Sequence, residues 1–212
     1  MSVDFLKRTR SSLAPLNVKI LQHPYLADAE QGTLPLEKIQ AFAANQYYII
    51  RHDAKSLALM ASRAPTPEAF AFFTTVFQGD AQAIPLVVEL AEAAGLRVAD
   101  LTTYSPIPEA VGYAHYLTTL AHGASPGEQA VVLIVNLPVW GSNCQRLSAA
   151  LRAAYHIEAT AFLDLFAQPT EALEAQALAI IEDYLAQEAQ LRRVARLIQA
   201  YELMFWDGIY RS

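Results

Sequence analysis

The stretch LEKIQAFAANQYYIIRHDAKSLALMASRA, residues 36–64, decides the fold class of this chain. Its apolar residues recur at three-, four- and seven-residue steps, as one face of a long helix requires. The residues of this face are Ile39, Phe42, Ile49, Ile50, Leu57 and Met60. Pro65 follows and marks the end of the periodic pattern. The spacing therefore predicts one long amphipathic helix over residues 36–64.

A second long helix is expected directly after the first, ending at about residue 94. Thr66 is a typical N-cap, and Glu68 places an acidic side chain near the positive end of the helix dipole. Gly95 supplies the C-terminal stop. Pro85 removes one backbone donor inside this helix, so we expect a kink near residues 79–86.

The rest of the chain also favours helices, with a loop over residues 97–108. Ser125 and Glu128 match a capping box that starts another helix. Residues 131–135, four of which are β-branched, are also typical of a short strand, but the cap and the lack of partner strands favour a helix. Further helices are expected over residues 108–121, 154–166, 170–187 and 188–210. No repeat or Gly/Ser-rich linker interrupts the chain, which predicts a single all-α domain over residues 1–212 with about seven to nine helices.

The amino-acid composition limits the kinds of binding partner that the chain can have. Fifteen Lys and Arg stand against 21 Asp and Glu, and a net charge of −6 argues against binding to nucleic acid. Hydrophobic residues make up 54% and charged residues 17%, which excludes a disordered chain. The longest apolar run, residues 130–140, falls short of the roughly 20 residues that cross a bilayer. With a single cysteine and no export signal, a cytoplasmic protein without a membrane partner is expected.

Metal and nucleophile motifs are missing from the sequence. None of the five histidines has a carboxylate or second histidine three or four residues away, so we expect no metal site. Cys144 lies inside a predicted helix with no base or helix N-terminus nearby, which favours a buried, inert thiol. No Gly-rich phosphate-binding loop or serine nucleophile elbow is present.

Two helical faces carry polar residues within apolar stripes. Gln46, Ile49 and Asp53 share one face of the first long helix. Near the C-terminus, a second stripe contains Glu202 among aromatic residues: Gln199, Glu202, Phe205, Trp206 and Ile209. Burial would raise the pKa of Glu202 and suit it to general acid or base catalysis. For both carboxylates the alternative is a structural role, with the charge paired to an arginine or a tyrosine hydroxyl.

Several short motifs resemble, in order, the TenA/thiaminase II family. They are His23–Leu26 (HPYL), Gly32–Glu37 (GTLPLE), Asn45–Tyr48 (NQYY), Leu137–Trp140 (LPVW) and Tyr201–Trp206 (YELMFW), with Pro108 to Leu117 fitting the same pattern. The resemblance spans nearly the whole chain. It implies the heme-oxygenase-like all-helical bundle with a central pocket, and a homo-oligomer, either a dimer or a tetramer. It also implies hydrolysis of thiamin or its breakdown products.

Within this resemblance the family's glutamate falls on Glu202, but other functional positions have changed. The cysteine position holds Val139, the aspartate position holds Gln46, and two tyrosine positions hold Ile49 and Phe166. Without a thiol there is no covalent displacement, and a neutral amide weakens ionic recognition of an aminopyrimidine. These changed positions therefore argue against a standard thiaminase.

We expect a protein that binds a small nitrogen-heterocyclic or aromatic metabolite and, if it is an enzyme, hydrolyses it with Glu202 as acid or base. The side chains expected to orient the ligand or to wall the pocket are Gln46, Asp53, Tyr113, Asn143, Tyr48, Trp140 and Trp206. One alternative is a non-catalytic ligand-binding or interaction protein on the same scaffold. A second is a PqqC-like cofactor-assembly oxidase. No cofactor is expected, and a di-iron site is disfavoured because Gln82 and Val88 occupy the positions of its ligands.

Overall fold

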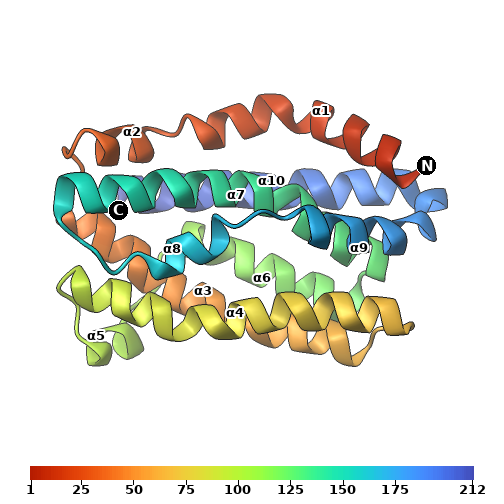
Figure 1. Cartoon of the computed structure of the whole chain (residues 1–212), viewed down its shortest axis with the longest axis horizontal. Coiled ribbons are helices and arrows are strands. Elements are labelled where there is room, and N and C mark those ends of the chain that lie inside the picture. The colour runs from red at the N-terminus through yellow and green to blue at the C-terminus, as the bar shows by residue number, and fades with distance from the viewer.

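The computed structural model describes residues 1–212 and is built of α-helices with one short 3₁₀ helix (Figure 1). The elements are α1 (Ser2–Leu21), α2 (Pro24–Glu30), α3 (Leu36–Ser62), α4 (Pro67–Ala93), α5 (Val98–Thr103), α6 (Pro108–Gly123), α7 (Pro126–Tyr155), α8 (Ala161–Phe166), α9 (Glu171–Glu182), η1 (Leu185–Gln187) and α10 (Glu188–Arg211). The predicted all-α class is confirmed. None of the helices is both long and apolar enough to span a membrane.

The long helices run roughly parallel to the longest dimension of the molecule (Figure 1). α3 and α4 pack against each other along one side of the bundle, and α1 and α2 lie along the opposite side. α7 and α10 run between these two sides, and α6 packs against both α3 and α10. The side chains that face inward from α3, α4, α6, α7 and α10 therefore meet in the middle of the bundle.

Local signals in the sequence account for the main helix boundaries. Thr66 Oγ1 accepts a hydrogen bond from Ala69 N–H at 3.2 Å, which caps α4 as predicted. The capping box of α7 is present: Glu128 Oε2 accepts from Ser125 N–H at 2.9 Å. Residues 131–135 are helical and all buried, so they form helix rather than strand. Their β-branched side chains reflect burial on all sides of α7.

Some predicted boundaries were wrong. The expected loop over residues 97–108 contains α5, whose first turn is closed by the Asp100 carboxylate accepting from Arg97 N–H at 2.9 Å. Of the expected helix over residues 154–166, the first two residues belong to the end of α7 and only α8 forms a separate helix, because His156 has a left-handed φ of 55° and caps α7 after Tyr155. The N-terminal helices α1 and α2 were not predicted. By contrast, α4 runs through Pro85 as one helix to Ala93, in agreement with the predicted end at about residue 94.

A proline inside α7 is accommodated by a side chain from α1. Pro138 has no N–H, so the carbonyl of Ile134, four residues earlier, has no helical partner. Arg10 Nη2 donates to this carbonyl at 2.9 Å, and the same atom pairs with Glu174 Oε2 of α9 at 2.6 Å. One guanidinium thus satisfies the free carbonyl and connects α1, α7 and α9.

The buried apolar residues form two separate clusters rather than one continuous core. One contains the stacked aromatic rings of Phe42, Trp140 and Trp206, and the other contains Phe72 and Phe73. Tyr113 packs against both clusters. The candidate site lies where the two clusters meet.

Candidate functional site

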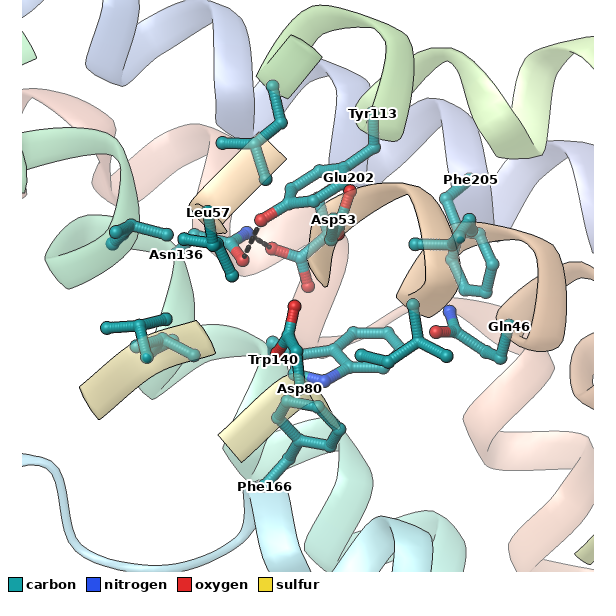
Figure 2. A pocket seen from close by; sticks show the side chains of 16 residues that line it. Gln46, Asp53, Leu57, Asp80, Tyr113, Asn136, Trp140, Phe166, Glu202 and Phe205 are labelled. Carbon is teal, nitrogen blue, oxygen red and sulfur yellow. Dashed lines mark hydrogen bonds between the residues drawn. The ribbon is translucent and has the colours of Figure 1, made fainter. Parts of the chain in front are cut away.

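A cavity of about 60 Å³ lies in the middle of the bundle (Figure 2). Six helices supply its walls: α3, α4, α6, α7, α8 and α10. The lining residues are Gln46, Ile49, Ile50, Asp53, Leu57, Val76, Asp80, Tyr113, Leu117, Leu133, Asn136, Leu137, Trp140, Phe166, Glu202 and Phe205. Apolar members of the lining come from both hydrophobic clusters, so the cavity separates the two.

Helical periodicity brings these side chains to the cavity. On α3, Gln46, Asp53 and Leu57 are separated by seven and four residues and therefore share one face. On α7, Leu133 and Trp140 are likewise seven residues apart on one face, with Asn136 between them. Each helix thus contributes about one side chain per turn to the wall.

Aromatic rings form one wall of the cavity. The Trp140 ring lies edge-to-face against Phe205, with centroids 5.7 Å apart, and edge-to-face against Phe166 at 6.2 Å. Behind it, Phe42 stacks on Trp140 with planes only 9° apart. These contacts fix the indole in place and leave a flat apolar surface toward the cavity.

Glu202 is held on this wall by a chain of hydrogen bonds. Asn136 Nδ2 donates to Glu202 Oε2 at 2.6 Å and also to Gln199 Oε1 at 3.0 Å. The orientation of the Asn136 amide is set by the hydroxyl of Tyr113, which donates to Oδ1 at 3.1 Å. From the other side, Trp206 Nε1–H donates to Glu202 Oε1 at 3.4 Å. The carboxyl group is thus held in place by α7 and by its own helix, with Tyr113 of α6 fixing the α7 amide.

Burial changes the acidity of Glu202. The side chain is only 2% exposed, and desolvation raises its pKa to about 8, although the hydrogen bonds from Trp206 and Asn136 lower it. No arginine or lysine pairs with it, so the structural alternative of an arginine partner, considered from the sequence, does not apply. A carboxyl group with this pKa exchanges a proton near neutral pH.

Glu202 is not the only acid in the cavity. Asp53 of α3 and Asp80 of α4 also line it, and they are only 6% and 8% exposed. Burial raises the pKa of Asp80 to about 8, and burial together with the charge of Asp80 raises the pKa of Asp53 well above its usual range. Figure 2 shows all three carboxyl groups directed into the cavity beside the Trp140 ring.

Two polar cavity residues were missed in the sequence, although each left a signal. Asp80 is the only charged residue between Glu68 and Glu89 on α4. Asn136 is the polar interruption of the longest apolar run, residues 130–140. A polar residue inside a buried apolar segment requires a partner or a cavity. Both residues could have been singled out on that ground.

Most of the predicted site residues lie around the cavity. Those that line it are Gln46, Ile49, Asp53, Tyr113, Trp140, Phe166 and Glu202. Val139 does not line the cavity and is buried in the hydrophobic cluster that contains Phe42 and Trp206. Trp206 is fully buried behind Glu202 and reaches it only through its indole N–H.

Two further predicted positions differ in the structure. Asn143 was expected on the pocket side, but its side chain faces α1, where Nδ2 donates to the carbonyl of Ile20 at 3.2 Å. Tyr48 was expected to wall the pocket. Its ring instead stacks on His52, and its hydroxyl is hydrogen-bonded to His115, outside the cavity. Asn143 lies four residues after Val139 on α7 and so shares its side of the helix, and Val139 itself lies outside the cavity lining.

The chemistry available to the cavity is that of carboxyl groups, amides and one phenol. No three His, Cys, Asp or Glu side chains converge in an arrangement that could hold a metal ion. Cys144 is fully buried away from the lining, and burial, together with the charges of Glu202 and Asp164, raises its thiol pKa well above the usual value. The thiol therefore supplies no nucleophile here.

A surface depression of about 240 Å³ lies next to the cavity, between α7 and the connection from α8 to α9. Leu137 and Phe166 line both spaces and separate them. Small-molecule pockets begin at about 300 Å³. Neither space alone reaches this size, whereas the two together do.

Known proteins share both the sequence pattern and the fold of this chain. Its sequence matches the model of the TENA/THI-4/PQQC family over residues 10–212, and no curated protein matches it. A TenA homologue from P. horikoshii OT3 superimposes with a TM-score of 0.80 at 20% identity, covering 100% of this chain and 99% of the other. A TenA homologue from Pseudomonas syringae pv. tomato str. DC3000 gives 0.84 at 13% identity, covering 97% and 92%.

A third solved structure identifies the type of fold. A domain of unknown function with a heme oxygenase-like fold, from Shewanella denitrificans OS217, superimposes with a TM-score of 0.81 at 13% identity. The match covers 97% of this chain and 92% of that domain. The chain therefore has the heme oxygenase-like fold, as the sequence motifs implied. Since the family model covers nearly its whole length, the chain belongs to the TENA/THI-4/PQQC family.

Proposed function

We propose that this protein binds a small nitrogen-heterocyclic or aromatic metabolite in the central cavity, and that Glu202 acts on it as a general acid and base. The observation that carries the proposal is the placement of Glu202. Its carboxyl group is buried beside aromatic rings, oriented by Asn136 and Trp206, and raised in pKa to about 8. Membership of a family that includes TenA supports a ligand of this class.

The reaction that fits these groups is hydrolysis of a carbon–nitrogen bond. The Glu202 carboxylate would take a proton from water as the water oxygen attacks carbon. The protonated carboxyl group would then return that proton to the leaving nitrogen as the bond breaks. With a pKa of about 8, roughly one molecule in ten carries the carboxylate at neutral pH, so both forms are accessible.

The same cavity also supports a non-catalytic ligand-binding protein. Its lining contains no Cys, Ser, Thr, Lys or His, so it offers no thiol, aliphatic hydroxyl, amine or imidazole as a nucleophile. Val139, which occupies the family's cysteine position, is apolar and lies outside the lining. On this alternative, Glu202 recognises the ligand through hydrogen bonds without transferring a proton.

Mass spectrometry of incubations with aminopyrimidines and thiamin-derived compounds separates the two functions. The hydrolase function predicts turnover by the natural protein and its loss in Glu202→Gln, with the fold and ligand binding retained. Glu89→Gln is the matched control, since Glu89 is an exposed acid outside the cavity. Unchanged kinetics in Glu202→Gln would refute the role of Glu202. Binding without turnover would favour the non-catalytic function, and oxygen consumption would indicate a PqqC-like oxidase.

We also propose that the protein forms a homo-oligomer, a dimer or a tetramer. Leu197 and Met204, two exposed apolar side chains, lie seven residues apart on one face of α10 and provide apolar surface for such a contact. Light scattering coupled to size-exclusion chromatography measures the mass directly. A monomer across the accessible concentration range would refute this proposal.

A further inference from the structure

Asp53 and Asp80 form a second polar group in the cavity that the proposed role of Glu202 leaves without a function. They come from neighbouring helices, α3 and α4, and both line the cavity. The Asp53 Oδ1 atom is fully buried and has no hydrogen-bond partner in the protein. A buried carboxyl oxygen without a partner carries the full cost of its desolvation. A ligand with an N–H or O–H donor would supply the missing partner.

The lining of the cavity contains acidic side chains but no positively charged one. Its lining contains three acidic residues and no Lys, Arg or His. None of the ion pairs of the protein includes Asp53, Asp80 or Glu202. The charge that acts on Asp53 is that of Asp80, and the charges of Asp53, Glu202 and Asp80 all act on Tyr113. A ligand that brings positive charge and N–H donors would complement this environment.

The arrangement suits an organic cation better than a metal ion. The three acids do not converge on a common point in the way that metal ligands do. Aromatic surface lies directly beside them, with Trp140 and Phe205 on one wall. A protonated amine attached to a ring or a short carbon chain uses both features.

The extent of the cavity indicates how such a ligand would lie. Gln46 and Asp53 are seven residues apart on α3, which separates them by about 10 Å along the helix axis. Figure 2 shows Gln46 and Phe205 at one end of the cavity, with the carboxyl groups of Asp53 and Asp80 toward the other and Trp140 between. The ring end of a ligand thus fits near Gln46, and its amino end fits near the two aspartates.

We propose that Asp53 and Asp80 form a subsite for a protonated amino group, so that the natural ligand of the cavity is an organic amine. This inference rests on the proposed binding function of the same cavity and narrows its ligand class. It assigns the two aspartates to recognition and leaves proton transfer to Glu202. The Asp53 Oδ1 atom would accept an N–H from the ligand and thereby gain the partner it lacks.

Isothermal titration calorimetry with paired probes tests this inference. Benzylamine and ethylenediamine are compared with their neutral counterparts, benzyl alcohol and ethylene glycol, at millimolar concentration. The full chain is expected to bind each amine more tightly than its neutral counterpart. Asp53→Asn and Asp80→Asn are expected to weaken amine binding by about 10- to 100-fold, since each removes a hydrogen bond to a charged group. Glu89→Gln, on the same helix as Asp80 but exposed, is expected to change nothing.

The outcomes separate this inference from the proposed catalysis. In Glu202→Gln the preference for amines should persist while turnover is lost. Retained turnover in that variant refutes the catalytic role alone. Equal binding of amines and neutral counterparts, or no amine binding at all, overturns the amine subsite. Amine binding that survives both aspartate substitutions also overturns it, with circular dichroism verifying that each variant is folded.

Discussion

The buried carboxyl group of Glu202 should make the stability of the protein depend on pH. In the folded chain its pKa is raised from 4.5 to about 8, so the folded state holds a proton that the unfolded state releases. The stabilisation is therefore fully present below about pH 4.5 and is lost as pH rises through about 8. Because protonation of Glu202 is coupled to folding, the free energy of unfolding should fall by about 4 kcal/mol between about pH 5 and pH 9.

Glu202→Gln isolates this contribution. The amide keeps the shape of the side chain and its acceptor for Asn136, but it does not titrate. It presents a donor to the indole N–H of Trp206, which costs a similar amount at every pH. The difference in unfolding free energy between the variant and the natural protein should thus shift by about 4 kcal/mol in favour of the variant between about pH 5 and pH 9.

Urea unfolding followed by far-ultraviolet circular dichroism measures this difference. With a typical slope of about 2 kcal/mol per molar urea, the unfolding midpoint of the variant should rise by about 2 M relative to the natural protein across this pH range. Contributions from the other acids cancel in the comparison. A difference between the two proteins that is the same at both pH values would refute the burial and raised pKa of Glu202.

Two packing contacts elsewhere give sharp tests of the fold by the same unfolding measurement. Arg10→Met should lower stability by about 1–3 kcal/mol, because it leaves the Ile134 carbonyl without a donor; no loss would contradict that role. Gly141→Ala should cost about 1–3 kcal/mol or more, because its added Cβ would lie 2.5 Å from the backbone oxygen of Phe166. Gly79→Ala, where nothing lies within 4 Å, should instead stabilise by about 0.5–1 kcal/mol, and equal effects of the two glycine substitutions would refute the contact.

The long helices were predictable because their signals are local. Thr66 and Ser125 cap helices whose apolar periodicity persists over many turns, and both caps form as expected. The short helices could not be predicted from local signals in the same way. α5 and α8 have only six residues each, too few for periodicity to distinguish them from a loop.

The site was predictable one helix at a time but not as an assembly. The stripe on α10 predicted that Glu202 faces the interior, and its side chain lines the cavity, because a helix face is a property of a single segment. The presence of Asp53 and Asp80 in one cavity depends on the packing of α3 on α4, which no single-helix pattern specifies. Asn143 illustrates the same limit, since the position of α1 decides which way its amide turns.

The division of the hydrophobic core has a practical consequence. A molecule occupying the space between the two clusters would touch both and join them into one continuous apolar interior. At a concentration of about 100 times its dissociation constant it would add about 2.7 kcal/mol to the folded state. For a chain of this length that corresponds to a rise of about 5–10 °C in the melting temperature. Heat denaturation in the presence of candidate metabolites would therefore identify the occupant even if it undergoes no reaction.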